Sequence, residues 1–433
     1  MTANDARWDG VAIIGAGLAG LGCALELPGA RVFEANAHPG GHAFSHDLGG
    51  VPFDEGAHIS HTKDLDFLAL ICAQAGDVHR VEPSIVRNYW NGHWTGYPIQ
   101  NHLRDLPVEM RIDALTDLVS AQLKYDGPEG ATYQDWLTRQ YGAFLTDRFY
   151  EVFTQKYWRR STDQLSTDWL GGRLLPSDLE NIIAGAFGGA VRPQASFNTF
   201  HYPATGGFFS FFAALYNDLS ISYEHRVVEV DLSAKELLFD SGSSEAFEVL
   251  ASSMPLPDLV NAITSVPSSV RDAADSLHHT KLLCVNLVVG QPDLTEAHWC
   301  YVYDLDIPPS RLSFPGNLAP GSVPPGKSAI QAEVFRDNRE TWNIDALAEE
   351  TIEKVARLLG FDSALVVQTG LVEVPHAYVV SDHARRDAVD HICDWLAERG
   401  VHTFGLYGGW NYLWSDAAFA SGRAVAEAIR ANA

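Results

Sequence analysis

The most regular pattern near the N-terminus is a run of apolar residues interrupted by glycines. Val11–Ile14 is short and mostly β-branched, as expected for a strand buried on both faces of a parallel sheet. Gly15, Gly17 and Gly20 follow, and apolar residues then recur at helical spacing until a second short apolar run, Arg31–Phe33. This order predicts a strand, a tight turn, a helix and a second parallel strand.

Further along the chain, the spacing of apolar residues changes several times. Ile85–Trp94 and Leu282–Val289 have the spacing of strands and predict a separate antiparallel sheet, whereas residues 107–190 have helical spacing. Beyond residue 206 helical and strand patterns alternate again. We expect helices at Phe208–Leu219, Asn343–Leu359, Asp382–Arg399 and Asp416–Ala431, strands near Arg226–Asp231 and Glu248–Ser252, and a loop at Pro315–Gly326.

The glycines at the N-terminus indicate a nucleotide site. In Gly15-x-Gly17-x-x-Gly20 the first glycine permits a tight turn, the second lets the backbone approach a pyrophosphate, and the third lets the helix pack closely on the strand. The N-terminus of that helix would face the negative charge. Glu34 ends the second strand and can accept hydrogen bonds from a ribose. The pattern predicts a dinucleotide site, and the alternative interpretation is a tight strand–helix turn that binds no nucleotide.

The charge balance restricts the possible partners. The chain has 30 Lys and Arg residues against 55 Asp and Glu residues, a formal net charge of −25. This balance argues against nucleic acid and against an anionic membrane surface as partners. The apolar stretch Val11–Leu27 is interrupted by glycines and contains Glu26, so we predict no membrane span. An acidic protein that binds an anionic substrate must gather its few cations, and we expect a small site built from arginines.

The cysteines of the sequence do not indicate a reactive or metal-binding site. The five cysteines are scattered, and none forms a Cys-x-x-Cys pair. We therefore predict no metal site and no disulfide framework, and a reducing cytoplasm is the expected location.

Short motifs, in order along the chain, resemble a known family of flavoenzymes. Gly40-Gly41-His42, just after Glu34, is similar to the extended nucleotide motif of the FAD-dependent amine-oxidase group. Residues 56–62, Gly-Ala-His-Ile-Ser-His-Thr, resemble the Gly-x-His-x-x-His-Thr pattern of UDP-galactopyranose mutase, within the amine-oxidase and protoporphyrinogen-oxidase-like superfamily. Similar segments lie at residues 90–101, 153–158, 202–208, 306–311 and 405–413.

The resemblance implies FAD as the cofactor, in its reduced form if the protein is a mutase. It implies catalytic roles for five residues, with two arginines and two tyrosines on a diphosphate: His58, Arg192, Arg311, Tyr378 and Tyr412. It implies substrate contacts for Trp158, Tyr202 and Asn101. The residues expected to bind the cofactor are Gly15, Gly17, Ala19, Gly20, Glu34, Ala35, Gly41, His42, His58, Val227, Gly405, Tyr412, Leu413 and Ser421.

Two departures from the family pattern concern the substrate. Leu406 stands where the mutases have an arginine, and Tyr378 is followed by valine where the family has proline. Loss of a guanidinium at Leu406 removes a bidentate phosphate partner. The departures leave the flavoprotein interpretation intact, but the substrate is then either a different sugar nucleotide or no nucleotide at all.

Pattern and resemblance together predict an α/β protein. Its discontinuous Rossmann-like FAD-binding domain would comprise residues 1–75, 200–255 and 381–433. We expect a helical domain at residues 107–190 and an antiparallel β-sheet domain, which holds the substrate, at residues 76–106 and 256–380.

The implied activity is a redox-neutral isomerisation that interconverts the pyranose and furanose forms of a sugar nucleotide. Reduced flavin is the nucleophile in this chemistry, and no nucleophilic side-chain constellation stands out in the sequence. Expected partners are a sugar nucleotide, a flavin reductant and, as the candidate assembly, a second copy in a homodimer. One alternative is an FAD-dependent amine oxidase or desaturase-type oxidoreductase, and another is a flavin-binding protein without catalysis.

Overall fold

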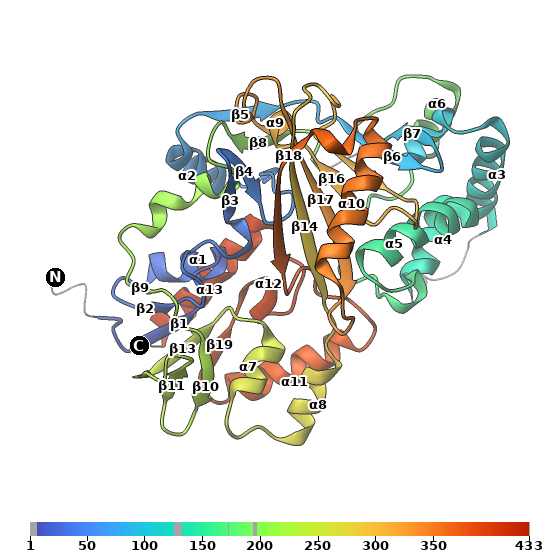
Figure 1. The fold of residues 1–433 in the computed structure, drawn as a ribbon. Coiled ribbons are helices and arrows are strands. Elements are labelled where there is room, and N and C mark those ends of the chain that lie inside the picture. The colour runs from blue at the N-terminus through green and yellow to red at the C-terminus, as the bar shows by residue number, and fades with distance from the viewer. Residues whose placement is uncertain (1–6, 125–131, 172, 194–196, 433) are drawn as a thin grey trace.

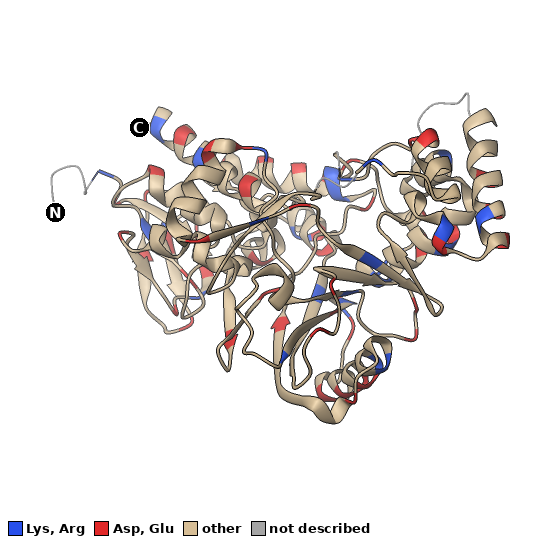
Figure 2. Ribbon diagram, turned by 90° about the horizontal axis from the view of Figure 1, so that it is seen from above, with Lys and Arg blue, Asp and Glu red and all other residues tan. Residues whose placement is uncertain are grey.

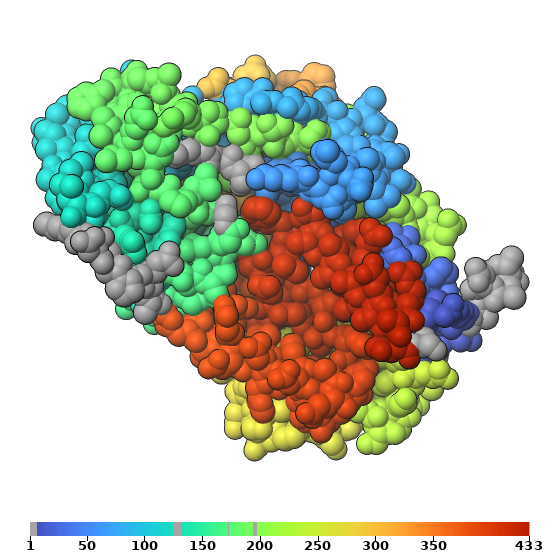
Figure 3. Space-filling view, turned by 180° about the vertical axis from the view of Figure 1, so that it is seen from behind, coloured from blue at the N-terminus to red at the C-terminus, as the bar shows by residue number. Residues whose placement is uncertain are grey.

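The computed structural model describes residues 7–432 apart from 125–131, 172 and 194–196. Two sheets organise the chain, and a group of helices stands beside the larger one (Figure 1). Seen from behind, the C-terminal segment borders both the helical region and an N-terminal part of the chain (Figure 3). Charged residues are scattered along the ribbon in all of these parts (Figure 2).

The smaller main sheet is entirely parallel and contains the glycine motif. Its first strand is buried at all four positions, as its β-branched sequence predicts. The pairing joins segments that are far apart in the sequence. In spatial order the strands are β19 (Val401–Thr403), β13 (Val249–Ser252), β1 (Val11–Ile14), β2 (Arg31–Phe33) and β9 (Ile221–Ser222).

Helices from the two ends of the chain pack against each other beside this sheet (Figure 1). They are α1 (Leu18–Glu26) and α13 (Ser415–Ala431). A Cβ atom on Gly22 would lie 2.2 Å from the carbonyl oxygen of Phe419, and one on Gly422 would lie 1.9 Å from that of Ala19. Only glycine permits this close approach, so the two helices are fixed at backbone contact.

The larger sheet has seven strands, and all neighbours are antiparallel except β15 and β6. Alternate residues of β14 face opposite sides. Leu283 and Val285 pack with α10 (Ile344–Leu359), whereas Leu282 and Cys284 belong to the core shared with the helical region. The order is β18 (Val366–Val374), β14 (Thr280–Val289), β17 (Ser328–Asp337), β16 (Arg311–Ser313), β15 (Trp299–Val302), β6 (Val86–Trp90) and β7 (His93–Gly96).

The helical region contains α3 (Val108–Lys124), α4 (Tyr133–Leu145), α5 (Glu151–Tyr157) and α6 (Leu179–Phe187). Thr132 and Asp135 cap α4 reciprocally. The other elements are α2 (Leu65–Ala75), α7 (Leu256–Ala262), α8 (Ser268–Ser276), α9 (Pro315–Leu318), α11 (Arg385–Ala397), α12 (Gly405–Gly408), β3 (Ser45–Leu48), β4 (Val51–Asp54), β5 (Val78–Val81), β8 (Phe200–Pro203), β10 (Val227–Asp231), β11 (Glu236–Phe239) and β12 (Ser244–Ala246).

The α/β class with parallel, antiparallel and helical parts is confirmed, and the domain boundaries stay a prediction. Two local expectations were wrong. The helix expected at Phe208–Leu219 is instead two short 3₁₀ segments, Phe208–Phe211 and Ala213–Tyr216, although its buried phenylalanines at 208, 211 and 212 have the spacing of one helix face. The loop expected at Pro315–Gly326 begins with one helical turn, α9, which starts at its proline.

Candidate functional site

A cavity of about 660 Å³ extends from the glycine motif to the aromatic side chains of the helical region and the larger sheet. The carboxyl ends of β1 and β2 open into it at one end, through Gly15 and Glu34. Ligands of open α/β sheets bind at this edge. Residues from all three parts of the fold therefore line one continuous space.

The cofactor end of the cavity is a cradle of backbone. Gly17 precedes α1 and caps it with no side chain, so the first N–H groups of the helix can bind an anion. Gly41 faces Gly17, and a Cβ atom on Gly41 would lie 3.1 Å from the Cα atom of Gly17. Gly20 brings the helix down onto the turn, because its Cβ would lie 1.9 Å from the carbonyl oxygen of Gly15. This shape fits a dinucleotide pyrophosphate.

Glu34 is fixed in position beside this cradle. Its Oε2 accepts a hydrogen bond from the backbone N–H of Ala16 at 2.8 Å, and its Oε1 accepts one from Asn36 at 2.9 Å. The side chain is buried and lines the cavity, as do Ala35 and Val227. An oriented carboxylate at this place fits the ribose of an adenine dinucleotide.

The structure brings most of the expected cofactor residues together. Gly20 and Ser421 do not line the cavity and instead support it from behind, since Ser421 Oγ accepts a hydrogen bond from Gly405 N at 3.0 Å. The expected residues that line the cavity are Gly15, Gly17, Ala19, Glu34, Ala35, Gly41, His42, His58, Val227, Gly405, Tyr412 and Leu413.

His58 enters the cavity as a neutral imidazole. Burial lowers its pKa, and the nearby carboxylate of Asp54 only partly opposes this effect. Its Nδ1 lies 2.9 Å from the carbonyl oxygen of Gly56, so Nδ1 carries the proton and donates it. The Nε2 atom is consequently an acceptor, and His58 provides a hydrogen-bond acceptor at neutral pH rather than a charge.

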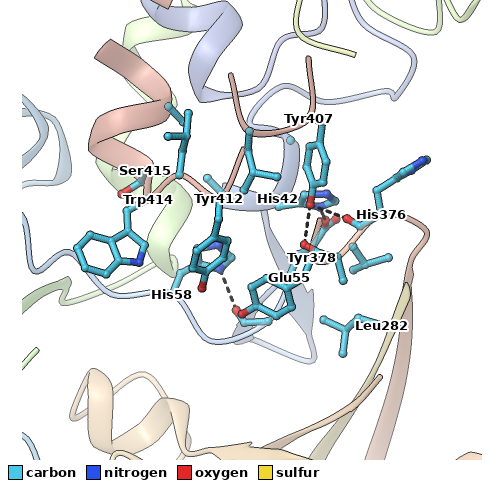
Figure 4. A pocket seen from close by; sticks show the side chains of 18 of the residues that line it. His42, Glu55, His58, Leu282, His376, Tyr378, Tyr407, Tyr412, Trp414 and Ser415 are labelled. Carbon is cyan, nitrogen blue, oxygen red and sulfur yellow. Dashed lines mark hydrogen bonds and ion pairs between the residues drawn. The ribbon is translucent and has the colours of Figure 1, made fainter. Parts of the chain in front are cut away.

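A second histidine, His42, shares a carboxylate with His46. Glu55 accepts a hydrogen bond from His42 Nδ1 at 2.8 Å and one from His46 Nε2 at 2.9 Å (Figure 4 shows the first contact). Burial opposes ionisation of Glu55, but the two hydrogen bonds outweigh it and lower its pKa to about 2. Glu55 therefore stays ionised and orients His42 in the wall of the cavity.

This cluster predicts acid-sensitive stability. A depressed pKa gives stabilisation that is present above the ordinary value of 4.5 and is lost as the pH falls towards 2. We expect Glu55→Gln to lower the free energy of unfolding by about 2–3 kcal/mol at pH 7, and by about half that at pH 3. Urea unfolding at several pH values measures the difference. Glu349→Gln, on the exposed face of α10, is the control, and a Glu55→Gln difference that does not change with pH would contradict the prediction.

Aromatic side chains form the far end of the cavity. The rings of Tyr378 and Tyr412 lie 5.5 Å apart and point into the same space (Figure 4). The ring of Trp158 lies 5.1 Å from that of Tyr378 and 5.7 Å from that of Tyr412. Burial raises the pKa of both tyrosines, so each hydroxyl keeps its proton and can donate to an anion.

Arg311 is held rigidly at this end by Glu333. Its Nε and Nη2 donate to the two carboxylate oxygens at 2.8 and 2.7 Å. Glu333 is fully buried and also accepts a hydrogen bond from Ala57 N at 2.9 Å. No described residue binds the third guanidinium nitrogen, Nη1. The ion pair therefore fixes an arginine that still has a free donor.

A second arginine at this end, Arg173, is one that the sequence reasoning missed. Its guanidinium lies 4.3 Å from the ring centre of Tyr412 and 4.9 Å from that of Trp414. It donates to the carbonyl oxygens of Trp169 at 2.9 Å and Tyr412 at 2.6 Å. The charges of Arg173 and Arg311 both oppose the rise in the pKa of Tyr412, and all three residues line the cavity. The sequence signal was weak, a break in helical spacing before α6.

Arg192, expected on the diphosphate, does not line the cavity. Its side chain is 62% exposed and forms an ion pair with Asp178 at 2.8 Å. Its backbone N–H donates to Asn181 at 2.8 Å, so the chain after α6 folds back onto that helix and away from the cavity. Arg159 and Arg160 also turn away, and are paired with carboxylates of the larger sheet region.

Two of the three residues expected to contact the substrate also lie outside the cavity. Tyr202 is buried, and its hydroxyl donates to Asp54 at 2.7 Å, so it supports the fold. Asn101 is fully buried where α6 packs against its backbone, at Gly185. Neither residue lines the cavity, whereas Trp158 does.

The backbone cradle lies at the end of a parallel sheet, and the Glu34 carboxylate is fixed where it can bind a ribose. Together they define a dinucleotide-binding flavoprotein fold. The sequence of residues 18–430 matches the family of flavin containing amine oxidoreductases. The chain belongs to this family, and its cofactor is FAD.

Solved structures share this fold. A reduced UDP-galactopyranose mutase is 23% identical with a TM-score of 0.89, covering 98% of this chain and 94% of that chain. A protein from Exiguobacterium, provisionally assigned as a protoporphyrinogen oxidase, is 15% identical with a TM-score of 0.76, covering 98% and 99%. An oxidoreductase from Methanosarcina mazei is 16% identical with a TM-score of 0.65, covering 96% and 99%. At these identities the likeness concerns the fold.

Within the described residues, no helix combines the length and apolarity needed to cross a membrane. The same residues contain no group of three or more His, Cys, Asp or Glu side chains arranged to hold a metal ion.

Proposed function

We propose that this flavoenzyme interconverts the pyranose and furanose forms of a sugar nucleotide, with FAD in its reduced state. The observation that carries the proposal is the pair of arginines, Arg173 and Arg311, that line the same cavity as Tyr412. In a chain of net charge −25, two guanidiniums facing one space favour a ligand with more than one negative charge.

When bound, reduced FAD supplies the nucleophile for the anomeric carbon of the sugar. The protein residues have a different task. Negative charge grows on the diphosphate as its bond to the sugar breaks, and Arg173 and Arg311 are placed to neutralise it. Tyr378 and Tyr412 stay protonated and add hydrogen bonds from their hydroxyl groups. The same groups retain the diphosphate so that it can rejoin the sugar after the ring has changed size.

The aromatic end of the cavity supports a nucleotide rather than a bare sugar phosphate. Phe153, Tyr157 and Trp158 line it and provide flat apolar surfaces for a base or a sugar face. Gln100 also lines it and accepts a hydrogen bond from Tyr150 at 3.0 Å, so a polar amide is held among the rings. Such a site combines stacking with a few directed hydrogen bonds.

One assay tests the proposal. The FAD-loaded protein is reduced with dithionite and incubated with UDP-galactofuranose, and the products are separated by anion-exchange chromatography. The proposal expects conversion to the pyranose form with reduced protein and none with oxidised protein. Because the identity of the sugar is open, other UDP-hexoses are run in parallel, and failure with all of them would contradict the proposed function.

A second candidate is an FAD-dependent oxidoreductase that acts on an amine or another apolar substrate. The observation that favours it is Leu406, an apolar side chain in the cavity wall among many aromatic rings. Steady hydrogen peroxide formation with such a substrate would support this activity, and net redox neutrality would exclude it. Use of a flavin reductant and association as a homodimer stay predictions.

The tyrosine hydroxyls should contribute modestly to binding. We expect Tyr378→Phe to raise the Kd for UDP about three- to tenfold, because one neutral hydrogen bond to the diphosphate is lost. Isothermal titration calorimetry on the FAD-loaded protein measures it. Tyr216→Phe is the matched control, since Tyr216 is buried outside the cavity and has no partner for its hydroxyl among the described residues. Equal Kd values for Tyr378→Phe and wild type would contradict the prediction.

A further inference from the structure

We propose that Lys156 is a positioning residue for substrate binding, whose buried ammonium group fixes the loop that leads to Arg311. The inference rests on the proposed function, since it assigns Arg311 to the substrate diphosphate. The lysine belongs to α5, the helix that ends with the cavity residue Tyr157 and is followed by Trp158. Through one side chain it would hold two walls of the site in register.

The ammonium group occupies a cage of backbone carbonyl groups. Lys156 Nζ donates to the oxygens of Val302 at 2.8 Å, Asp304 at 2.9 Å, Ile307 at 2.9 Å and Pro309 at 2.8 Å. All four belong to the end of β15 and the loop before β16, and the lysine itself is 6% exposed. Buried carbonyl oxygens need hydrogen-bond donors. The ammonium group at the centre provides donors to these four carbonyl groups of the loop.

The cage continues directly into the arginine site. Ser310, the residue between Pro309 and Arg311, donates from Oγ to the carbonyl oxygen of Lys156 at 3.2 Å. Its backbone N–H donates to the carbonyl oxygen of Glu333 at 2.8 Å. Arg311 then forms its two hydrogen bonds to the carboxylate of Glu333. Helix α5, the loop and β17 are thus joined at the residue before Arg311.

The charge of the amine is set by opposing effects. Burial lowers the pKa of Lys156, the carboxylates of Asp304 and Asp306 raise it, and Arg336 lowers it, so that together they bring the pKa to about 7. Four acceptors around one nitrogen match the three N–H donors of an ammonium better than the two of a neutral amine. A carbonyl cage of this kind resembles the surroundings of a monovalent cation, with the cation here tethered to a helix.

This view leads to a chemical-rescue experiment. Lys156→Ala empties the cage, so ammonium chloride should refill it, whereas Lys156→Met fills the space with an apolar chain that ammonium cannot displace. We expect both variants to retain FAD, measured by absorbance, and to raise the Kd for UDP at least tenfold in sodium chloride. Ammonium chloride at equal ionic strength should restore most of the affinity of Lys156→Ala and leave Lys156→Met unchanged.

Lys354→Ala is the matched control. Lys354 reaches the same loop from α10, with its Nζ 2.8 Å from Asp306, but outside the carbonyl cage. Its removal takes one positive charge from the loop and should change the Kd for UDP less than twofold.

The outcomes separate the two proposals. Wild-type protein that binds no UDP or other nucleoside diphosphate would overturn the proposed function and this inference with it. Wild-type protein that binds UDP, with unchanged Kd in both Lys156 variants, would overturn the positioning role alone. Weakened binding without selective rescue of Lys156→Ala would show a packing role and would also overturn it.

Discussion

Replacing Arg311 with methionine is expected to abolish turnover and to destabilise the protein at the same time. The fold fixes the position of Arg311 through two hydrogen bonds to a fully buried carboxylate. Loss of its charge removes stabilisation of the departing diphosphate, and we expect kcat/KM to fall about 10³-fold or more. The substitution also leaves the buried carboxylate of Glu333 without a positive charge beside it, which lowers the free energy of unfolding by about 3–5 kcal/mol.

A double variant separates the two effects. In Arg311→Met/Glu333→Gln the buried charge is gone, while the glutamine oxygen can still accept the hydrogen bond from Ala57 N. We expect most of the stability to return and the activity to stay lost. Urea unfolding and the ring-isomerisation assay measure the two quantities on the same preparations. If the double variant were active, Arg311 would not be needed for the reaction.

Arg173→Ala is expected to weaken substrate binding with a modest effect on stability. The guanidinium packs on the rings of Tyr412 and Trp414 at the cavity and pairs with no carboxylate among the described residues. Its removal therefore leaves no buried charge behind. We expect the Kd for UDP to rise about ten- to a hundredfold, or about 1.4–2.8 kcal/mol, and the unfolding free energy to fall by about 1–2 kcal/mol through the lost hydrogen bonds to Trp169 and Tyr412, less than for Arg311→Met. Binding should also become less sensitive to salt.

Arg192→Ala is the matched control for Arg173→Ala. Both variants remove one arginine charge, but Arg192 is 62% exposed, is paired with Asp178 and lies outside the cavity. We expect its Kd for UDP to stay within twofold of wild type. Calorimetry with UDP on the two FAD-loaded variants compares them directly, and equal losses would place the diphosphate somewhere other than beside Tyr412.

The contrast between Arg173 and Arg192 shows which features of the site local sequence patterns can predict and which they cannot. The glycine turn, Glu34 and the helix from Asn343 to Gly360 were predictable because short-range chemistry sets them: backbone approach, a ribose acceptor and two helix caps. Which arginine of the helical region reaches the cavity depends on how α5 and α6 pack, and helical spacing carries no information on that.

Local patterns also do not reveal which polar residues the fold buries outside the cavity. Tyr202 belongs to a segment that resembles a family motif, yet its hydroxyl is used by Asp54. The need to satisfy a buried carboxylate arises only when the chain has folded, because β4 and β8 are nearly 150 residues apart in the sequence. Trp158 has the same aromatic character, but the fold leaves it in the cavity wall. Composition does not distinguish the two situations.

The contact between α1 and α13 has a consequence for biosynthesis. The cofactor cradle needs both helices, since Leu18 and Ser415 line the same cavity, and the glycines at 22 and 422 interlock them. About 390 residues separate the two helices, so at 5–20 residues per second a ribosome would need roughly 20–80 s between them. The first strand and helix therefore stay without this packing partner during that time, and the complete cradle for FAD forms only after α13 has been synthesised.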